Sequence, residues 1–532
     1  MEISNYAPCN KKGTSSKFFN GLIMLNVPCH FKIKRKGESF MLKYLKAEAN
    51  AAFTENGAMA FATTESDCLD LFATVGALRY ASDDEIEKRF MRAYAENKDI
   101  STKLLFFARD VRGGLGERRV FRIILHWLTK NAPETVRKNV GKIAEYGRYD
   151  DLLVLLGTSC EAEALSVIGE QFRCDMSSLE NGGEVSLLGK WLPSVNASNT
   201  LTVINAKKVA RYLGMNDRDY RKSLVALRER IKIIENNLRT RDYTFDYSKQ
   251  TSSALYRYRK AFLRNDGSRY IEFLKSAREG GAKLNASNVM PYELIKPLFT
   301  SYGDYIGYQL DEGEIEAINT TWQNLPNYCG MENSLPVIDL SGSMYFNAGG
   351  MPAMVALSLG IYAAERNGGI FKNHFISFSE KARLIEVKGS DFTSKVQYVS
   401  SFNEIANTNL ENVFDLILNA ALKNQVSQNE LPARLIIISD MEFDRCVDSG
   451  NQRIFEYEKA KYASYGYKLP EVVFWNVASR NMQHPVTVNE SGVSLVSGCT
   501  PRIFSMVAKG SLSPYVFMLE VLRNERYSQI VA

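Results

Sequence analysis

The spacing of apolar and polar residues predicts helices over the first part of the chain. From about residue 41 to 325, apolar residues recur at intervals of three and four, which is the period of an amphipathic helix. Segment 83–94 is typical, because acidic residues fill its first turn and Phe90 and Tyr94 follow at helical spacing. No strand alternation stands out in this region. We expect antiparallel helices with short links, in an α-helical repeat that forms a HEAT-like solenoid or a ring.

The further helices expected in this region lie at 101–109, 117–130, 134–146, 161–174, 206–213, 217–238, 252–262, 267–279 and 291–300.

The pattern changes near residue 325, where short apolar runs alternate with helices. Buried strands are expected at 335–340, 374–378, 434–440, 471–477 and 493–497, with a hairpin strand at 382–387. Helices are expected between them at 350–366, 409–423, 453–464 and 512–523. Near-continuous Val, Ile and Leu strands that alternate with helices predict an α/β domain with a mostly parallel, doubly wound sheet. The chain is therefore multidomain, with an N-terminal arm over 1–40, a helical domain over 41–325 and an α/β domain over 326–532.

The composition is that of a globular chain with an uneven charge. Of the 532 residues, 45% are hydrophobic and 24% are charged, which excludes disordered, collagen-like and coiled-coil classes. Residues 1–300 hold 48 Lys and Arg against 35 Asp and Glu, whereas residues 301–532 hold 18 against 25. Residues 201–300 alone hold 21 against 10. This asymmetry predicts that one part of the chain binds a polyanion and that the other part has a different function.

Targeting signals and cysteine clusters are absent from the sequence. The first residues do not form a secretory signal, and no run of about 18 apolar residues predicts a transmembrane helix. The eight cysteines are scattered without a CxxC pair, and there are four histidines. We expect a cytoplasmic protein with free thiols, no membrane contact and no multi-histidine metal site.

Oxygen ligands gather at the predicted carboxyl ends of the buried strands. Asp339, Ser341 and Ser343 follow the first strand in a D-x-S-x-S pattern. Thr408 opens the helix expected at 409–423, and Asp440 ends the buried strand that follows this helix. Ligands bind at this edge of parallel α/β sheets, and hard oxygens suit Mg²⁺ or Mn²⁺. These five residues are therefore candidate metal ligands, and the alternative is a helix-capping loop without metal.

Nothing in the sequence predicts catalysis at this cluster. No histidine lies near it along the chain, and no serine stands in a G-x-S-x-G elbow. The glycine run at 113–116 lacks the G-K-[ST] of a phosphate loop. We expect a protein that is not an enzyme. A metal-assisted phosphoesterase is the weakest alternative, since no general base is evident.

The order of the five ligands along strands and helices resembles the von Willebrand factor A (vWA) domain with its metal-ion-dependent adhesion site (MIDAS). All five ligand positions of that family are matched by Asp339, Ser341, Ser343, Thr408 and Asp440. The resemblance implies an ion that recruits an acidic side chain of a partner and breaks no bond.

Two runs in the helical region, 107–118 and 145–153, resemble the TROVE module of the Ro autoantigen family. They read Phe-Ala-Arg-Asp-Val-Arg-Gly-Gly-Leu-Gly-Glu-Arg and Glu-Tyr-Gly-Arg-Tyr-Asp-Asp-Leu-Leu. Runs at 190–194, 256–264 and 285–287 resemble more closely the uncharacterised family called domain of unknown function 2828, known in part from large viruses. In the Ro family, helical repeats close into a ring that binds non-coding and misfolded RNA, so the resemblance implies RNA binding here.

The local charge gives independent support for an RNA site. Between residues 207 and 264, basic residues that suit phosphates are interleaved with tyrosines that suit unpaired bases. A smaller basic cluster lies at 109–119. The candidate RNA-binding residues are Arg211, Arg221, Lys222, Arg257, Tyr258, Arg259, Lys260, Arg264, Arg109 and Arg112. The alternative is the solvated face of amphipathic helices.

Two functions of different classes follow. The first is an RNA-binding protein of the ribonucleoprotein type, which holds single-stranded or structured non-coding RNA on basic helices and carries a Mg²⁺-binding domain. The alternative is a non-enzymatic protein–protein scaffold whose metal site binds an exposed Asp or Glu of a partner.

Overall fold

The structure is a computed structural model that describes residues 40–300, 304–330, 333–377, 382–402, 409–444, 453–510 and 513–532. The chain falls into two compact units, residues 1–49 and residues 50–532. In the first unit the described part is helix α1 (Phe40–Ala49). The predicted arm over 1–40 lies outside the described residues except for its last position.

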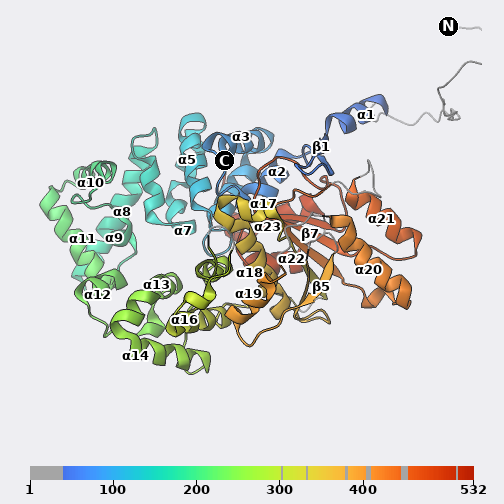
Figure 1. Ribbon diagram of the computed structural model, residues 1–532. Helices are drawn as coiled ribbons and strands as arrows, with labels where there is room; N and C mark the ends of the chain where they lie inside the picture. The colour runs from blue at the N-terminus through green and yellow to red at the C-terminus, as the bar shows by residue number, and fades with distance from the viewer. Residues whose placement is uncertain are drawn as a thin grey trace, which may run out of the picture. The chain divides into compact units, whose positions relative to one another are not determined.

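The second unit begins with a short hairpin and continues with helices (Figure 1). The helices of this part are α2 (Asp67–Thr74), α3 (Asp83–Glu96), α4 (Lys98–Arg109), α5 (Arg118–Asn131), α6 (Pro133–Asn139), α7 (Ile143–Tyr146), α8 (Glu161–Glu180), α9 (Leu188–Trp191), α10 (Thr200–Tyr212), α11 (Asp217–Ile231), α12 (Ile234–Thr240), α13 (Ser252–Arg257), α14 (Arg259–Arg278), α15 (Pro291–Ile295) and α16 (Glu312–Gln323). The predicted helical region is confirmed.

The hairpin was not predicted. Strands β1 (Ala51–Phe53) and β2 (Met59–Phe61) pair antiparallel, and Gly57 in the connection takes the left-handed φ of 88° that glycine accepts without steric cost. Strands of three residues are too short to show an alternation of apolar and polar positions.

The C-terminal part is an α/β domain, as predicted. Among the described residues, its sheet has six strands in the order β5-β4-β3-β6-β7-β8, all parallel except the edge strand β5. The strands are β3 (Ser334–Ile338), β4 (His374–Ser377), β5 (Arg383–Glu386), β6 (Arg434–Ser439), β7 (Glu471–Asn476) and β8 (Val493–Ser497). The helices are α17 (Gly342–Phe346), α18 (Met351–Arg366), α19 (Phe392–Ser400), α20 (Leu410–Asn424), α21 (Ile454–Ser464), α22 (Arg502–Lys509) and α23 (Pro514–Leu522).

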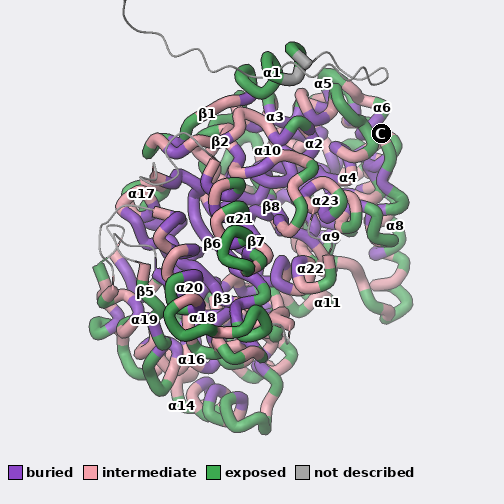
Figure 2. The backbone as a smooth tube through the Cα atoms, turned by 90° about the vertical axis from the view of Figure 1, so that its right-hand side faces the viewer, coloured by how far each residue is buried: buried purple, intermediate pink, exposed green. Residues whose placement is uncertain are grey.

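Helices cover both faces of this sheet. Side chains of β3, β6 and β7 pack alternately against α18 and α22 on one face and against α20 and α21 on the other. Figure 2 shows buried residues along the central strands, with exposed residues on the outer sides of the helices. Burial on both faces explains why these strands are continuous runs of Val, Ile and Leu. None of the described helices is long and apolar enough to cross a membrane.

The helical part and the α/β domain share one hydrophobic core. Helix α2 packs against β8, and the backbone N–H of Gly76 donates to Ser497 Oγ at 3.0 Å. A Cβ at position 76 would lie 2.5 Å from the carbonyl oxygen of Ser497, so only glycine fits this approach. Near the C-terminus, Tyr527 donates to the buried carboxylate of Asp110 at 3.0 Å. These contacts fix the helical part against β8 and the C-terminal segment of the α/β domain.

Candidate metal centre and basic surface

Two neighbouring strand ends bring the predicted aspartates together. Strands β3 and β6 pair in parallel with Ile338 opposite Ile438, so Asp339 and Asp440 leave the sheet at the same edge. The N–H of Asp339 still donates to the carbonyl of Ile438 at 3.1 Å. Buried strands therefore fix the positions of both carboxylates.

The D-x-S-x-S loop turns its hydroxyls toward Asp440. Ser341 Oγ lies 3.2 Å from Ser343 Oγ, and Ser343 Oγ donates to Asp440 Oδ2 at 2.9 Å. Asp339 accepts from the N–H of Ser341 at 2.9 Å and from Ser439 Oγ at 2.6 Å. The structure thus brings four of the five predicted ligands together.

The fifth predicted ligand, Thr408, lies outside the described residues, and its role stays a prediction.

The two carboxylates are almost fully enclosed. Asp339 is 0% and Asp440 is 3% exposed. Burial raises the pKa of Asp339 above its ordinary range. Burial and the nearby charge of Asp339 raise the pKa of Asp440 to about 7, against the opposing effect of the Arg480 guanidinium. Two buried carboxylates with one partly compensating cation favour a further positive charge.

The donor set fits a small divalent cation. Octahedral Mg²⁺ holds oxygens at about 2.0–2.1 Å, which places adjacent ligands about 3 Å apart. The spacings of 3.2 and 2.9 Å along Ser341, Ser343 and Asp440 agree with that geometry. The described residues hold no cluster of three or more His, Cys, Asp and Glu side chains that suits a metal. A cation at this edge would therefore depend on serine hydroxyls beside the carboxylates.

Arg480 is a residue of this centre that the sequence did not reveal. Its Nη2 lies 2.8 Å from Asp440 Oδ2, and its Nη1 lies 2.6 Å from Glu55 Oε2 in the β1–β2 connection. The residue follows β7, the neighbour of β6 in the sheet. That position at the end of a third parallel strand was the signal that could have drawn attention to it.

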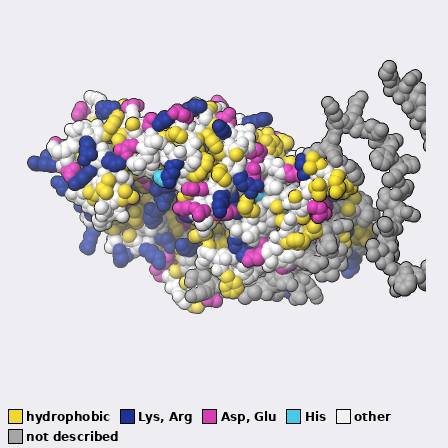
Figure 3. All heavy atoms as spheres, turned by 90° about the horizontal axis from the view of Figure 1, so that it is seen from above, with side chains coloured by type: hydrophobic (Ala, Val, Ile, Leu, Met, Phe, Trp, Pro, Cys, Tyr) yellow, Lys and Arg dark blue, Asp and Glu magenta, His cyan; other side chains and the backbone are white. Residues whose placement is uncertain are grey.

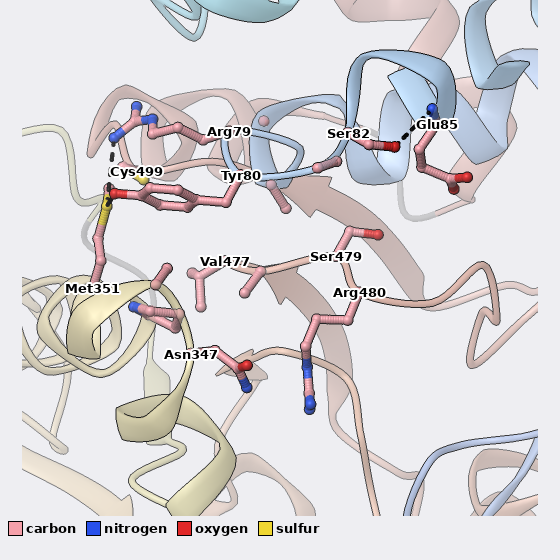
Figure 4. Close-up of a pocket in the computed structure, with 16 residues that line it drawn as sticks. Arg79, Tyr80, Ser82, Glu85, Asn347, Met351, Val477, Ser479, Arg480 and Cys499 are labelled. Atoms are coloured by element: carbon pink, nitrogen blue, oxygen red, sulfur yellow. Dashed lines mark hydrogen bonds between the residues drawn. The ribbon is translucent and has the colours of Figure 1, made fainter. Parts of the chain in front are cut away.

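A cavity of about 460 Å³ adjoins the centre (Figure 4). Arg480 and Asn347 line it, and Asn347 Nδ2 also donates to the backbone carbonyl of Ser343 at 2.7 Å. Arg79, Tyr80 and other residues of the helical part form the opposite wall. The cavity thus lies between the helical part and the strand ends.

Several predicted RNA-binding residues lie on the surface. Arg211 on α10 and Arg221 and Lys222 on α11 are exposed, and Figure 3 shows Lys and Arg side chains at the left-hand end, where these helices lie in Figure 1. The other exposed members of the predicted set are Arg112, Arg257, Lys260 and Arg264, of which Lys260 lies 3.2 Å from Glu314.

Arg109 and Arg259 lie inside the protein instead. Arg109 is 2% exposed, and its Nη2 lies 2.7 Å from Asp151 Oδ2. Arg259 Nη2 lies 2.8 Å from Glu314 Oε1. Their charges are compensated by buried carboxylates, so neither residue belongs to the exposed basic surface.

The interleaved tyrosines are mostly engaged within the protein. Tyr220 and Tyr247 are buried, and the hydroxyl of Tyr256 donates to the Glu293 carbonyl at 2.8 Å. Tyr258, the tyrosine in the predicted RNA-binding set, is half-buried and donates to Glu235 at 3.1 Å. Tyr212 is the most exposed of these tyrosines, at 43%. The basic part of the predicted surface therefore has much more open area than its aromatic part.

These features define a helical protein with a C-terminal α/β domain whose strand ends carry an oxygen-rich centre. Residues 54–168 and 201–328 match the family called domain of unknown function DUF2828, and residues 333–513 match domain of unknown function DUF7788. The similarity to the first family that the sequence motifs predicted is confirmed.

A curated relative and a solved structure are similar over most of the chain. "Uncharacterized protein L728" of Acanthamoeba polyphaga mimivirus is 28% identical over 512 residues, which cover 89% of this chain and 87% of the relative. The crystal structure of the Deinococcus radiodurans RO (RSR) protein is 12% identical and covers 86% of this chain and 93% of its own, with a TM-score of 0.39.

Proposed function

We propose that this protein binds RNA, single-stranded or structured and non-coding, through the exposed basic residues of α10 and α11. The main support is the exposure of three basic side chains, those of Arg211, Arg221 and Lys222. All three are exposed, and among the described residues none has an ion-pair or side-chain hydrogen-bond partner. Charges that the fold does not use are available for an external polyanion.

The inner side of α11 explains why these charges point outward. Tyr220, Leu224 and Leu227 are buried at intervals of four and three residues, so Lys222 lies on the opposite side of the helix and Arg221 on its flank. Lys and Arg on such a surface neutralise phosphates and release counterions, which gives affinity without reading the base sequence. Arg112, Arg257 and Arg264 are further exposed positions of the predicted set.

The α/β domain contributes a cation site in this proposal. Asp339, Ser341, Ser343 and Asp440, with Thr408 as the predicted fifth ligand, would hold Mg²⁺ or Mn²⁺. A bound ion would offer a coordination position to an acidic group. The four described residues would orient and enclose that ion, and we propose no enzymatic step.

The test of RNA binding is charge reversal on α11. Arg221→Glu combined with Lys222→Glu should weaken binding of a fluorescent single-stranded RNA by roughly tenfold or more and lower its salt dependence. Lys423→Glu combined with Lys468→Glu is the matched control, because it makes the same charge change at exposed positions of the α/β domain. Equal losses in both double variants would reject a site on α11.

The second candidate function is a protein–protein scaffold, which the oxygen-rich centre favours. If the ion grips an acidic side chain of a partner, Asp339→Ala should abolish partner capture without unfolding the chain. Capture that persists in this variant would exclude the metal bridge.

A further inference from the structure

We propose that Arg480 is a built-in competitor of the divalent cation at the candidate metal centre and sets how tightly that centre binds it. The inference rests on the cation site proposed above and is independent of RNA binding.

Arg480 contacts the oxygen that faces the serine hydroxyls. Asp440 Oδ2 accepts from Ser343 Oγ at 2.9 Å and from Arg480 Nη2 at 2.8 Å. A cation held by Ser343 and Asp440 would therefore share that oxygen, or its immediate surroundings, with a guanidinium. Like charges at such a short distance repel strongly, and a nearly buried site screens them little.

The guanidinium is held in place from the other side by the β1–β2 connection. Arg480 Nη1 lies 2.6 Å from Glu55 Oε2, and the N–H of Glu55 donates to Glu442 Oε2 at 2.7 Å. The side chains of Asn481 and Gln483 donate to the other oxygen of Glu442 at 2.8 and 2.7 Å. Arg480 thus belongs to a network that joins the loops after β6 and β7 to this connection.

Arg480 also has room to leave Asp440. The residue lines the cavity of about 460 Å³ next to the centre (Figure 4). Its Nε is buried without a hydrogen-bond partner among the described residues, so its present position leaves one donor unsatisfied. Movement toward the cavity would open Asp440 to a cation, and cation binding and the Arg480–Asp440 contact must then weaken each other reciprocally.

Arg480→Gln tests the competition directly. Removal of the charge should tighten Mn²⁺ binding by the full chain by roughly tenfold, measured by the loss of the free-ion signal in electron paramagnetic resonance. Arg480→Lys keeps the charge and should stay near wild-type affinity. Lys459→Gln makes the same charge change in a surface ion pair with Glu490 on the α/β domain and serves as the control.

Glu55→Gln should act in the opposite direction. Without Glu55, Arg480 keeps Asp440 as its carboxylate partner among the residues that the structure describes, so competition increases and Mn²⁺ binding weakens. In the Arg480→Gln background the same change should have little effect, because its influence passes through Arg480. A general charge effect would instead be equal in both backgrounds.

The outcomes separate this proposal from the cation site itself. Tighter binding in Arg480→Gln, with the loss in Glu55→Gln confined to the chain that keeps Arg480, supports the competition. Unchanged or weaker binding in a folded Arg480→Gln variant overturns the competition and leaves the cation site standing. Absence of Mn²⁺ binding in both wild type and Arg480→Gln overturns both.

Discussion

At the scale of single residues, arginines have opposite roles at different positions. Arg221 is exposed on α11, whereas Arg109 is enclosed with Asp151, and both stood in the predicted RNA-binding set. A local charge count cannot separate them, because the partner of Arg109 lies 42 positions away. The runs 107–118 and 145–153 therefore mark, in part, a buried ion pair.

That ion pair gives a prediction of stability. Asp151→Asn leaves the Arg109 guanidinium buried without its compensating charge, so the free energy of unfolding should fall by about 3–5 kcal/mol. Urea denaturation measures the loss. Asp217→Asn, which removes an exposed partner of Lys207, should change stability little. A loss of less than about 1 kcal/mol in Asp151→Asn would contradict a structural role for the pair.

Burial of His484 predicts a dependence of stability on pH. Burial lowers the pKa of His484 below its ordinary value of 6.5, against the opposing charge of Asp70. The unfolded chain then binds the proton more tightly, so this contribution to stability is present above pH 6.5 and is lost as the pH falls below it. In His484→Gln, the free energy of unfolding measured with urea should depend less on pH between about pH 7 and pH 5. Parallel curves of unfolding free energy against pH for the wild type and His484→Gln would refute this contribution of His484.

At the scale of elements, sequence patterns predicted the sheet well and some helix ends poorly. β6 contains a continuous buried aliphatic run from Leu435 to Ile438, and its position placed Asp440 correctly beside the D-x-S-x-S loop. The expected helix at 217–238 is instead two helices, α11 and α12, because Lys232 takes the left-handed φ of 52°. Neither glycine nor proline marks that break, so local sequence gave no warning of it.

The centre itself could be predicted only in part. Its aspartates and serines follow buried strands in a recognisable spacing, so residue order was sufficient to find them. Arg480 belongs to no recognisable motif, although it follows the neighbouring strand β7, and Glu55 reaches the sheet edge only through tertiary packing of the β1–β2 connection. The prediction that the interleaved tyrosines are open to RNA bases was mostly wrong for a related reason. An amphipathic helix can bury an aromatic ring on the side away from its charges.

At the scale of the whole molecule, the shared core makes residues 50–532 one compact unit. We expect a single unfolding transition for this unit, with coincident circular dichroism and tryptophan fluorescence curves. Gly76→Ala would press a Cβ against the backbone of Ser497 and should lower the stability of that whole transition by about 2 kcal/mol or more. Separate transitions for the helical part and the α/β domain would show that the core is not shared in solution.

We propose above that the exposed basic surface of α10 and α11 binds RNA. The most direct measurement is the affinity of the full chain for a fluorescent single-stranded RNA as salt rises from about 50 to about 200 mM. We expect binding at low salt that weakens by roughly tenfold or more over this range, as counterion release requires. Absence of binding at low salt, or an affinity that does not change with salt, would contradict it.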